Sequence, residues 1–141
     1  MPSYSAQSKT KLESTCVELQ HTFRIVILDY DNSILEGHRG QTAQDEYFRT
    51  GRSRVQFPNG KHNSVPSDAV DSAPYPIDWN NRERFVHYAG YVKGVARALG
   101  YRVRWGGDWD GDFDLKDQTF MDLVHFEFLG RYPGAYSVVP D

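Results

Sequence analysis

Several features that would mark a particular class of protein are scarce or absent in this sequence. Its 141 residues include one cysteine, so the chain cannot form an internal disulfide. No apolar run approaches the length of about 20 residues that a membrane-spanning helix needs. The N-terminal stretch MPSYSAQSKTKLES also lacks the apolar segment of a signal peptide. We therefore expect a product of the cytoplasm that does not insert into membranes.

The chain also lacks an excess of basic residues. Its formal net charge is −3, with 16 lysines and arginines against 19 acidic residues. A domain that binds nucleic acid through its phosphates normally carries a strong basic excess. We therefore do not expect nucleic acid to be the main partner.

The length fits one domain with one sizeable core and leaves no room for a separate targeting module. Apolar residues at helical spacing predict a long helix from Asn80 to Leu99, and one broken helix or two short ones between Leu12 and Ile27. Short strands are predicted at 33–36, 69–73, 101–105 and 123–129. Because these elements follow no regular βαβ period, we predict a single α+β domain, residues 1–141. A small antiparallel sheet would carry the functional site, with helices on its other face.

The stretch 61–79, KHNSVPSDAVDSAPYPIDW, places an imidazole and a carboxylate on either side of a turn. The residues between His62 and Asp71 begin with the serines and proline of a turn. They continue into small or β-branched residues that suit a buried strand before Pro74. Such a strand would point Asp71 inward. We interpret His62 and Asp71 as two ligands of one metal ion.

A third ligand has to come from elsewhere in the chain. Near the C-terminus, the segment 122–127 offers His125 with Asp122 three residues before it and Glu127 two residues after it. Three ligands and one carboxylate that is not a ligand make up a catalytic zinc site.

These motifs resemble those of the zinc peptidases that include D-Ala-D-Ala carboxypeptidases and phage L-alanyl-D-glutamate endopeptidases. The shared pattern is a His, a turn of small residues and Ala-x-Asp, followed far downstream by Asp-x-x-His-x-Glu. The resemblance extends over GHRGQTAQ at 37–44, AGYVKGVARALG at 89–100 and RWGGDWDGD at 104–112, and it matches best the phage endolysin branch. Two features depart from it: the spacer between His62 and Asp71 is long, and Val124 stands where a proline or glycine is expected.

The resemblance implies a role for each residue of the site. It implies one zinc per chain, bound by His62, Asp71 and His125, with Asp122 as the general base that also returns the proton to the leaving amine. Glu127 would orient a histidine or Arg39. Asp68 competes with Asp71 for the ligand role, and the Ala-x-Asp element favours Asp71.

Substrate contacts are implied less directly. The arginine of the GHRG motif faces the active site in this family, so Arg39 and Gln44 are expected to contact the substrate. Trp109 of the acidic loop is expected to form a wall of the substrate groove. The alternative for Arg39 is an internal salt bridge, for instance to Glu127, because arginine suits both kinds of carboxylate pairing.

The acidic loop 108–114, DWDGDFD, has alternating carboxylates that suggest calcium at Asp108, Asp110, Asp112 and Asp114. It departs from the EF-hand pattern, which requires glycine in place of Phe113 and glutamate in place of Thr119. The favoured interpretation is a loop that shapes the cleft, and calcium remains the alternative.

Two further features have competing interpretations. Arg49, Arg52, Arg54 and Lys61 form a basic run, which is either a solvated loop or a contact with an anionic wall polymer. Thr15 and Glu18 suggest a capping box that would place Cys16 at a helix N-terminus, where a thiol can become reactive. A buried small residue is the favoured interpretation of Cys16, and cysteine-peptidase chemistry is the alternative.

The function that the resemblance implies is that of an endolysin. We expect a zinc peptidase that cleaves the stem peptide of bacterial peptidoglycan, at the bond between L-alanine and D-glutamate, for host lysis. The alternatives are a D-Ala-D-Ala carboxypeptidase and a non-catalytic domain that binds wall peptides. The chain is expected to be a monomer, made in the host cytoplasm and released to the wall through a phage membrane pore.

Overall fold

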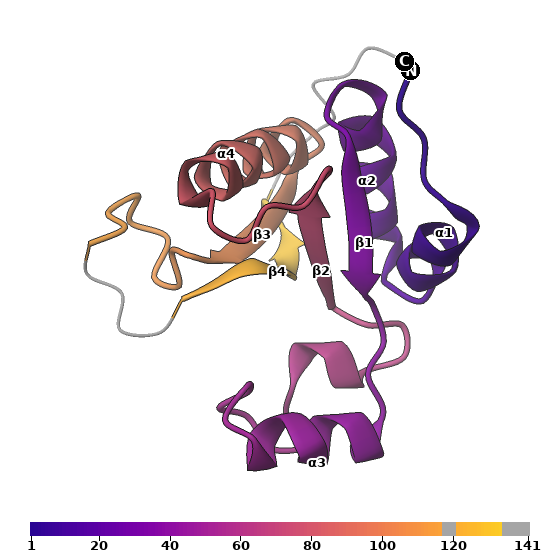
Figure 1. The fold of residues 1–141 in the computed structure, drawn as a ribbon, viewed down its shortest axis with the longest axis vertical. Helices are drawn as coiled ribbons and strands as arrows, with labels where there is room; N and C mark the ends of the chain where they lie inside the picture. The colour runs from indigo at the N-terminus through magenta and orange to yellow at the C-terminus, as the bar shows by residue number, and fades with distance from the viewer. Residues whose placement is uncertain (117–120, 134–141) are drawn as a thin grey trace.

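The computed structural model describes residues 1–116 and 121–133, and it confirms the predicted α+β class (Figure 1). The helices are α1 (Ala6–Glu13), α2 (Val17–Asp29), α3 (Gln41–Arg49) and α4 (Arg82–Ala98), with a short 3-10 turn η1 (Lys61–Asn63). The strands are β1 (Asn32–Glu36), β2 (Ala69–Pro74), β3 (Tyr101–Gly106) and β4 (Asp122–Arg131). Each predicted strand is present, with boundaries shifted by at most two residues.

The four strands form one antiparallel sheet in the order β1-β2-β4-β3. Helix α4 packs on β3, β2 and β4 and against α2, while α1 packs on β1. Helix α3 lies beyond the end of the sheet where β1 finishes and β2 begins (Figure 1). In the described part of the chain, no helix is both long enough and apolar enough to cross a membrane.

The register of β2 against β4 gives the sheet two different faces. Val70 lies opposite Phe126, and both are buried in the core under the helices. The next pair along the ladder, Asp71 opposite His125, points to the other face, because successive side chains alternate across a strand. One face therefore carries the core and the other carries polar side chains.

The N-terminal region forms two helices, as predicted, but the break differs from the predicted capping box. Cys16 is the N-cap of α2 and makes no side-chain capping bond, while the Thr15 hydroxyl donates to the carbonyl of Leu12 at 2.6 Å. The Cys16 thiol is buried, and burial raises its pKa to about 11. The favoured interpretation of Cys16 as a buried small residue is confirmed, and a reactive thiolate is disfavoured.

Phe126 is fully buried and packs edge-on against Phe23 and Tyr88, with ring centroids 5.7 and 6.0 Å away. Phe126→Ala should lower the free energy of unfolding by about 3–5 kcal/mol, because it removes a buried ring and leaves a cavity. Urea unfolding followed by circular dichroism measures this loss. The control is Phe113→Ala, whose ring is 83 % exposed and whose loss should change stability by less than about 0.5 kcal/mol. Equal effects would place Phe126 outside the core.

Candidate metal centre

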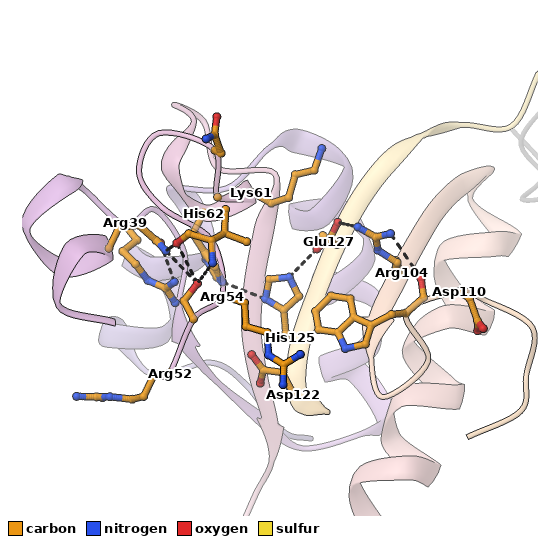
Figure 2. Close-up of a pocket in the computed structure, with 16 residues that line it drawn as sticks. Arg39, Arg52, Arg54, Lys61, His62, Arg104, Asp110, Asp122, His125 and Glu127 are labelled. Carbon is orange, nitrogen blue, oxygen red and sulfur yellow. Dashed lines mark hydrogen bonds and ion pairs between the residues drawn. The ribbon is translucent and has the colours of Figure 1, made fainter. Parts of the chain in front are cut away.

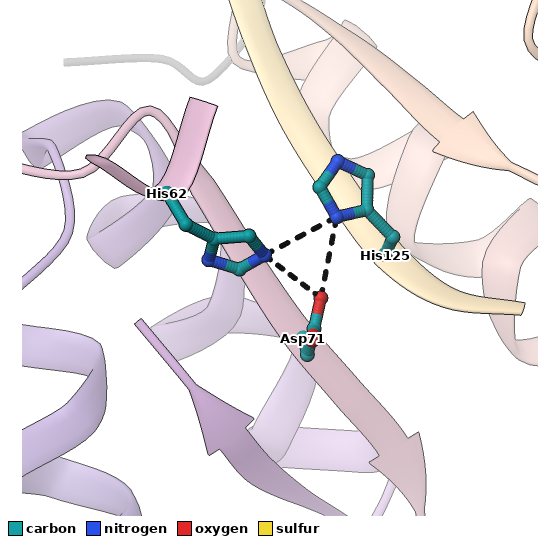
Figure 3. A group of neighbouring side chains, drawn as sticks. All are labelled: His62, Asp71 and His125. Atoms are coloured by element: carbon teal, nitrogen blue, oxygen red, sulfur yellow. Dashed lines mark hydrogen bonds and ion pairs between the residues drawn. The ribbon is translucent and has the colours of Figure 1, made fainter. Parts of the chain in front are cut away.

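Three side chains from two strands and one turn converge at one point (Figure 3). His62 Nε2 lies 3.1 Å from Asp71 Oδ1 and 3.2 Å from His125 Nδ1, and His125 Nδ1 lies 3.3 Å from Asp71 Oδ1. The two imidazoles are buried, and 14 % of the Asp71 side chain is exposed. The predicted ligands are therefore brought together, and they form a group that could hold a metal ion.

The size of this triangle fits a small metal ion. For a tetrahedral ion with ligands at about 2.05 Å, the distance between two ligand atoms is about 3.3 Å. The three observed distances of 3.1, 3.2 and 3.3 Å lie close to that value. Such a site leaves a fourth position for water or substrate, as catalytic zinc sites do. Asp68, the competing carboxylate, does not belong to the group.

The fold explains why the three residues meet. Asp71 and His125 are direct cross-strand neighbours in the ladder of β2 and β4. His62 comes from η1, and the GHRG segment holds it: Gly37 O contacts His62 Nδ1 at 2.7 Å, and the Arg39 N–H donates to His62 O at 2.8 Å. A Cβ atom at Gly37 would lie 2.2 Å from the carbonyl oxygen of Lys11, so the close packing of this segment against α1 requires glycine.

Hydrogen bonds to the outer nitrogens fix the tautomers of both histidines. His62 Nδ1 donates to the Gly37 carbonyl, and His125 Nε2 donates to Glu127 Oε1 at 2.9 Å. Arg104 in turn donates to Glu127 Oε2 at 2.6 Å. When the imidazoles are neutral, both inward nitrogens therefore keep their lone pairs for a metal, as in metal sites whose histidines give their second N–H to an acceptor.

The electrostatics of the triangle fit a cation between its members. Burial opposes the charge on Asp71, but hydrogen bonds from His125 and His62 overcome it and hold the pKa of Asp71 well below its usual range. Burial likewise lowers the pKa of His125, but its bonds with Asp71 and Glu127 outweigh burial and raise this pKa to about 9. A metal ion that binds at neutral pH therefore displaces a proton from His125.

Asp122 begins β4 and lines the same cleft as the two histidines (Figure 2). Burial, and then the nearby charge of Asp71, raise its pKa above the usual value of a carboxyl group. Its backbone lies against β3 at Gly106, where a Cβ atom would approach Asp122 O to 2.1 Å. Asp122 is not a member of the metal group. The site thus has a carboxylate beside the ligands with a raised proton affinity, which suits an acid-base role.

Arg39 and Gln44 line the cleft, but protein contacts occupy their polar atoms. Arg39 pairs with Glu36, donates to Gln44 Oε1 at 3.0 Å and lies 3.8 Å from Asp71 Oδ2. The predicted alternative of an internal salt bridge is thus observed, although its partner is Glu36 rather than Glu127. Arg39 is therefore placed to hold Asp71 from the side away from the histidines.

The cleft itself has a volume of about 520 Å³. Trp109 forms one wall, with its ring centroid 5.4 Å from that of His125. On the other side, the cleft is lined by three members of the basic run: Arg52, Arg54 and Lys61.

The acidic loop lies beside Trp109. Asp108, Asp110 and Asp112 each place a carboxylate oxygen within 4.8 Å of the others, and Asp114 is not part of this group. Asp108 is only 2 % exposed, and its Oδ1 has no hydrogen-bond partner among the described residues. Burial raises the pKa of Asp108, opposed by the N–H of Phe113 and assisted by the Asp110 carboxylate. Thr119, where the EF-hand pattern requires glutamate, lies outside the described residues.

Sequence reasoning missed three contributors to the site: Gly37, Arg104 and Glu36. Each acts through a partner. The Gly37 carbonyl orients His62, the Arg104 cation holds Glu127, and the Glu36 anion holds Arg39. Gly37 belongs to the GHRG motif, but its role could not be predicted, because every residue type has a backbone carbonyl. The pairing of Arg104 with Glu127 follows from the register of β3 against β4.

Comparisons with known proteins identify a family and relatives of this chain. The family model described as phage L-alanyl-D-glutamate peptidase matches residues 2–129. The L-alanyl-D-glutamate peptidase of Escherichia phage T5 is 29 % identical over 120 residues, which cover 82 % of this chain and 87 % of that protein. The crystal structure of the Serratia marcescens L-Ala D-Glu endopeptidase ChiX superposes with a TM-score of 0.72 at 25 % identity, covering 91 % of each chain.

His62→Ala and His125→Ala should each abolish binding of the one metal ion per chain, because either change removes a nitrogen donor from a three-ligand site. Metal content after dialysis, measured by inductively coupled plasma mass spectrometry, tests this. Two matched controls should keep their metal: His38→Ala, which removes an exposed imidazole, and Asp68→Asn, which removes the competing carboxylate. Full metal occupancy in either ligand variant would exclude that residue from the site.

Proposed function

Because the chain belongs to the family of phage L-alanyl-D-glutamate peptidases, we propose that His62, Asp71 and His125 hold a catalytic zinc ion. The chain is an L-Ala-D-Glu endopeptidase that acts on the stem peptide of peptidoglycan, in the manner of a phage lytic enzyme. The observation that carries the metal proposal is the triangle of His62 Nε2, Asp71 Oδ1 and His125 Nδ1. Two imidazoles and one carboxylate form a ligand set that suits zinc.

Zinc in this position supplies Lewis-acid polarisation of the scissile carbonyl and lowers the pKa of a coordinated water from 15.7 toward about 7. The chain has to supply the remaining steps. Asp122 accepts a proton from the attacking water and delivers it to the nitrogen of the leaving amine. The raised pKa of Asp122, caused by burial and the charge of Asp71, supports both halves of this transfer.

Glu127 is the other carboxylate of the cleft, and its contacts suit a different role. One oxygen accepts from His125 and the other accepts from Arg104. These two bonds, with the charges of both partners, lower the pKa of Glu127 against the effect of burial. A carboxylate whose oxygens are both engaged is a poor proton acceptor, so Glu127 orients His125 and Asp122 serves as the base.

The substrate lies in the cleft between Trp109 and the basic residues. Trp109 provides an indole face beside His125 against which a peptide backbone packs. Arg39 and Gln44 also line the cleft and remain predicted substrate contacts. Their internal hydrogen bonds give them a second role, because they fix Asp71 and the loop after α3.

The arrangement of the whole chain is also a proposal. We propose that residues 1–141 form one peptidase domain, since the described strands join one sheet and the family model spans 2–129. We further propose that the enzyme is a monomer, is made in the cytoplasm of the host and reaches peptidoglycan through a phage membrane pore. The description of the family as one of phage peptidases is what motivates this route.

A second cation is proposed in the acidic loop. Calcium is bound by carboxylate oxygens, and Asp108 offers a buried oxygen without a partner among the described residues, with Asp110 and Asp112 nearby. This loop adjoins Trp109, so an ion there would set the shape of one cleft wall without taking part in the chemistry.

Asp122→Asn should keep the zinc and lower turnover of muropeptides by about 10²- to 10⁴-fold, because an amide cannot accept the proton of the attacking water. Zinc content and product formation by mass spectrometry are measured on the same sample. Asp45→Asn, which changes an exposed carboxylate on α3, should turn over at the wild-type rate. A zinc-free Asp122→Asn would make Asp122 a ligand, and near-normal turnover would move the base to Glu127.

The double substitution of Asp110 and Asp112 by alanine should leave zinc content unchanged and abolish calcium binding, because it removes two of three grouped carboxylates. Metal analysis and calorimetric titration with calcium measure the two effects separately. Loss of zinc from this variant would show that the zinc ligands are misassigned. Calcium affinity equal to that of the wild type would show that calcium does not bind in the acidic loop.

A further inference from the structure

The basic run extends from the last residue of α3 to the first residue of η1, and no residue of it has a specific partner in the substrate so far. Three of its members, Arg52, Arg54 and Lys61, line the cleft. The fourth, Arg49, differs: its side chain is 71 % exposed and pairs with Glu46 at 2.6 Å, and it does not line the cleft. The run is thus divided between residues that face the substrate and one that faces solvent.

The loop that carries Arg54 is anchored rather than free in solvent. The buried amide of Gln44 donates to Ser53 Oγ at 3.0 Å and to Val55 O at 2.6 Å. These two contacts flank Arg54 on both sides. The Ser53 N–H also donates to Tyr47 O at 3.1 Å. The backbone at Arg54 is therefore fixed to α3, and the side chain extends into the cleft toward Asp122 in the view of Figure 2.

The side chains that line the cleft include more cations than carboxylates. Five cationic side chains and three carboxylates line it, although the formal net charge of the protein is −3. Two of the cations, Arg39 and Arg104, pair with Glu36 and Glu127. Figure 2 shows Lys61 and Arg54 on opposite sides of the two histidines. No hydrogen bond or ion pair of the Lys61 ammonium is found among the described residues. The cleft is therefore built to attract an anion close to the metal centre.

The substrate carries an anion at that place. The bond cleaved joins the carbonyl of L-alanine to the amine nitrogen of D-glutamate. The Cα atom of that glutamate also bears its α-carboxylate, which is free because the stem peptide continues through the γ-carboxyl group. The α-carboxylate is thus only two bonds from the scissile nitrogen. A substrate placed for reaction therefore brings this carboxylate into the cleft beside the metal ligands.

We propose that Arg54 is a specificity-determining residue that binds the α-carboxylate of D-glutamate, with Lys61 adding to the positive field from the other side. This inference rests on the proposed function of the site. The planar guanidinium of arginine can bind a carboxylate through two hydrogen bonds, which a carboxamide cannot accept equally well. The enzyme therefore prefers stem peptides with free D-glutamate over those in which this residue is amidated to D-isoglutamine.

The experiment uses the zinc-loaded full chain and two synthetic peptides, N-acetyl-L-Ala-γ-D-Glu-L-Lys and its D-isoglutamine counterpart. The wild type should cleave the acid with a kcat/KM about 10- to 100-fold higher than the amide, the range expected of a charge-assisted bidentate pair. Arg54→Gln should lose this preference through a higher KM for the D-glutamate peptide, with little change for the D-isoglutamine peptide. Arg54→Lys keeps the charge and should retain part of the preference.

Arg49→Gln is the matched control, because it removes a charge from the same basic run outside the cleft. It should keep the wild-type preference, and unfolding midpoints of all variants should agree. Equal losses of kcat on both peptides in Arg54→Gln, with a shifted pH profile, would overturn the inference and make Arg54 a positioning residue for Asp122. A wild type that cleaves both peptides equally would overturn it as well. A zinc-loaded wild type that cleaves neither peptide would instead overturn the proposed function.

A second pair of peptides identifies which carboxylate is bound. Replacing L-Lys by diaminopimelate adds a carboxylate at the third residue while the D-isoglutamine stays amidated. Under the proposal, this addition changes kcat/KM equally in the wild type and in Arg54→Gln. A gain that depends on Arg54 would assign its partner to the third residue and overturn the proposal.

Discussion

The rest of the structure depends on three lone pairs that face one another. His62 Nε2, Asp71 Oδ1 and His125 Nδ1 lie within 3.3 Å of each other, and both histidines already donate their other nitrogen elsewhere. Such acceptors repel one another unless a cation or a proton lies between them. The contacts of His125 with Asp71 and Glu127 outweigh burial and raise its pKa, as expected of a site that favours positive charge. The fold therefore holds in place an arrangement that is complete only with a positive charge.

Holding that arrangement requires contacts on every side of it. The register of β2 against β4 fixes two ligands relative to each other, and a glycine carbonyl fixes the third. Outside these, two ion pairs keep the ligands oriented: Arg104 with Glu127 behind His125, and Arg39 with Glu36 beside Asp71. In each pair the carboxylate accepts hydrogen bonds from the guanidinium, which fixes the orientation of both side chains. These contacts thus fix the geometry that metal binding needs.

The sequence allowed the ligands to be predicted because metal coordination restricts residue type. Only a few side chains bind zinc, and His62, Asp71 and His125 stood in a spacing that resembles a known family. The long helix α4 was predictable for a similar reason, since its apolar residues recur at one period. The role of Gly37 was not predictable, because it acts through a carbonyl that every residue has. The partner of Arg39 was also missed, since a choice between Glu36 and Glu127 depends on register and not on composition.

The contacts of Gln44 show why a motif residue and a specificity residue need not be the same. Its carbonyl oxygen accepts from Arg39 and Asn63, and its amide donates to Ser53 and Val55, so these bonds use its donor and acceptor groups within the protein. Gln44 is only 1 % exposed, and a buried amide that gave up these bonds to a substrate would leave several polar groups unsatisfied. Its internal bonds therefore also let Gln44 contribute to recognition through the loop that it anchors. Arg54 lines the cleft from that loop, and none of the hydrogen bonds that hold the metal ligands involves its side chain.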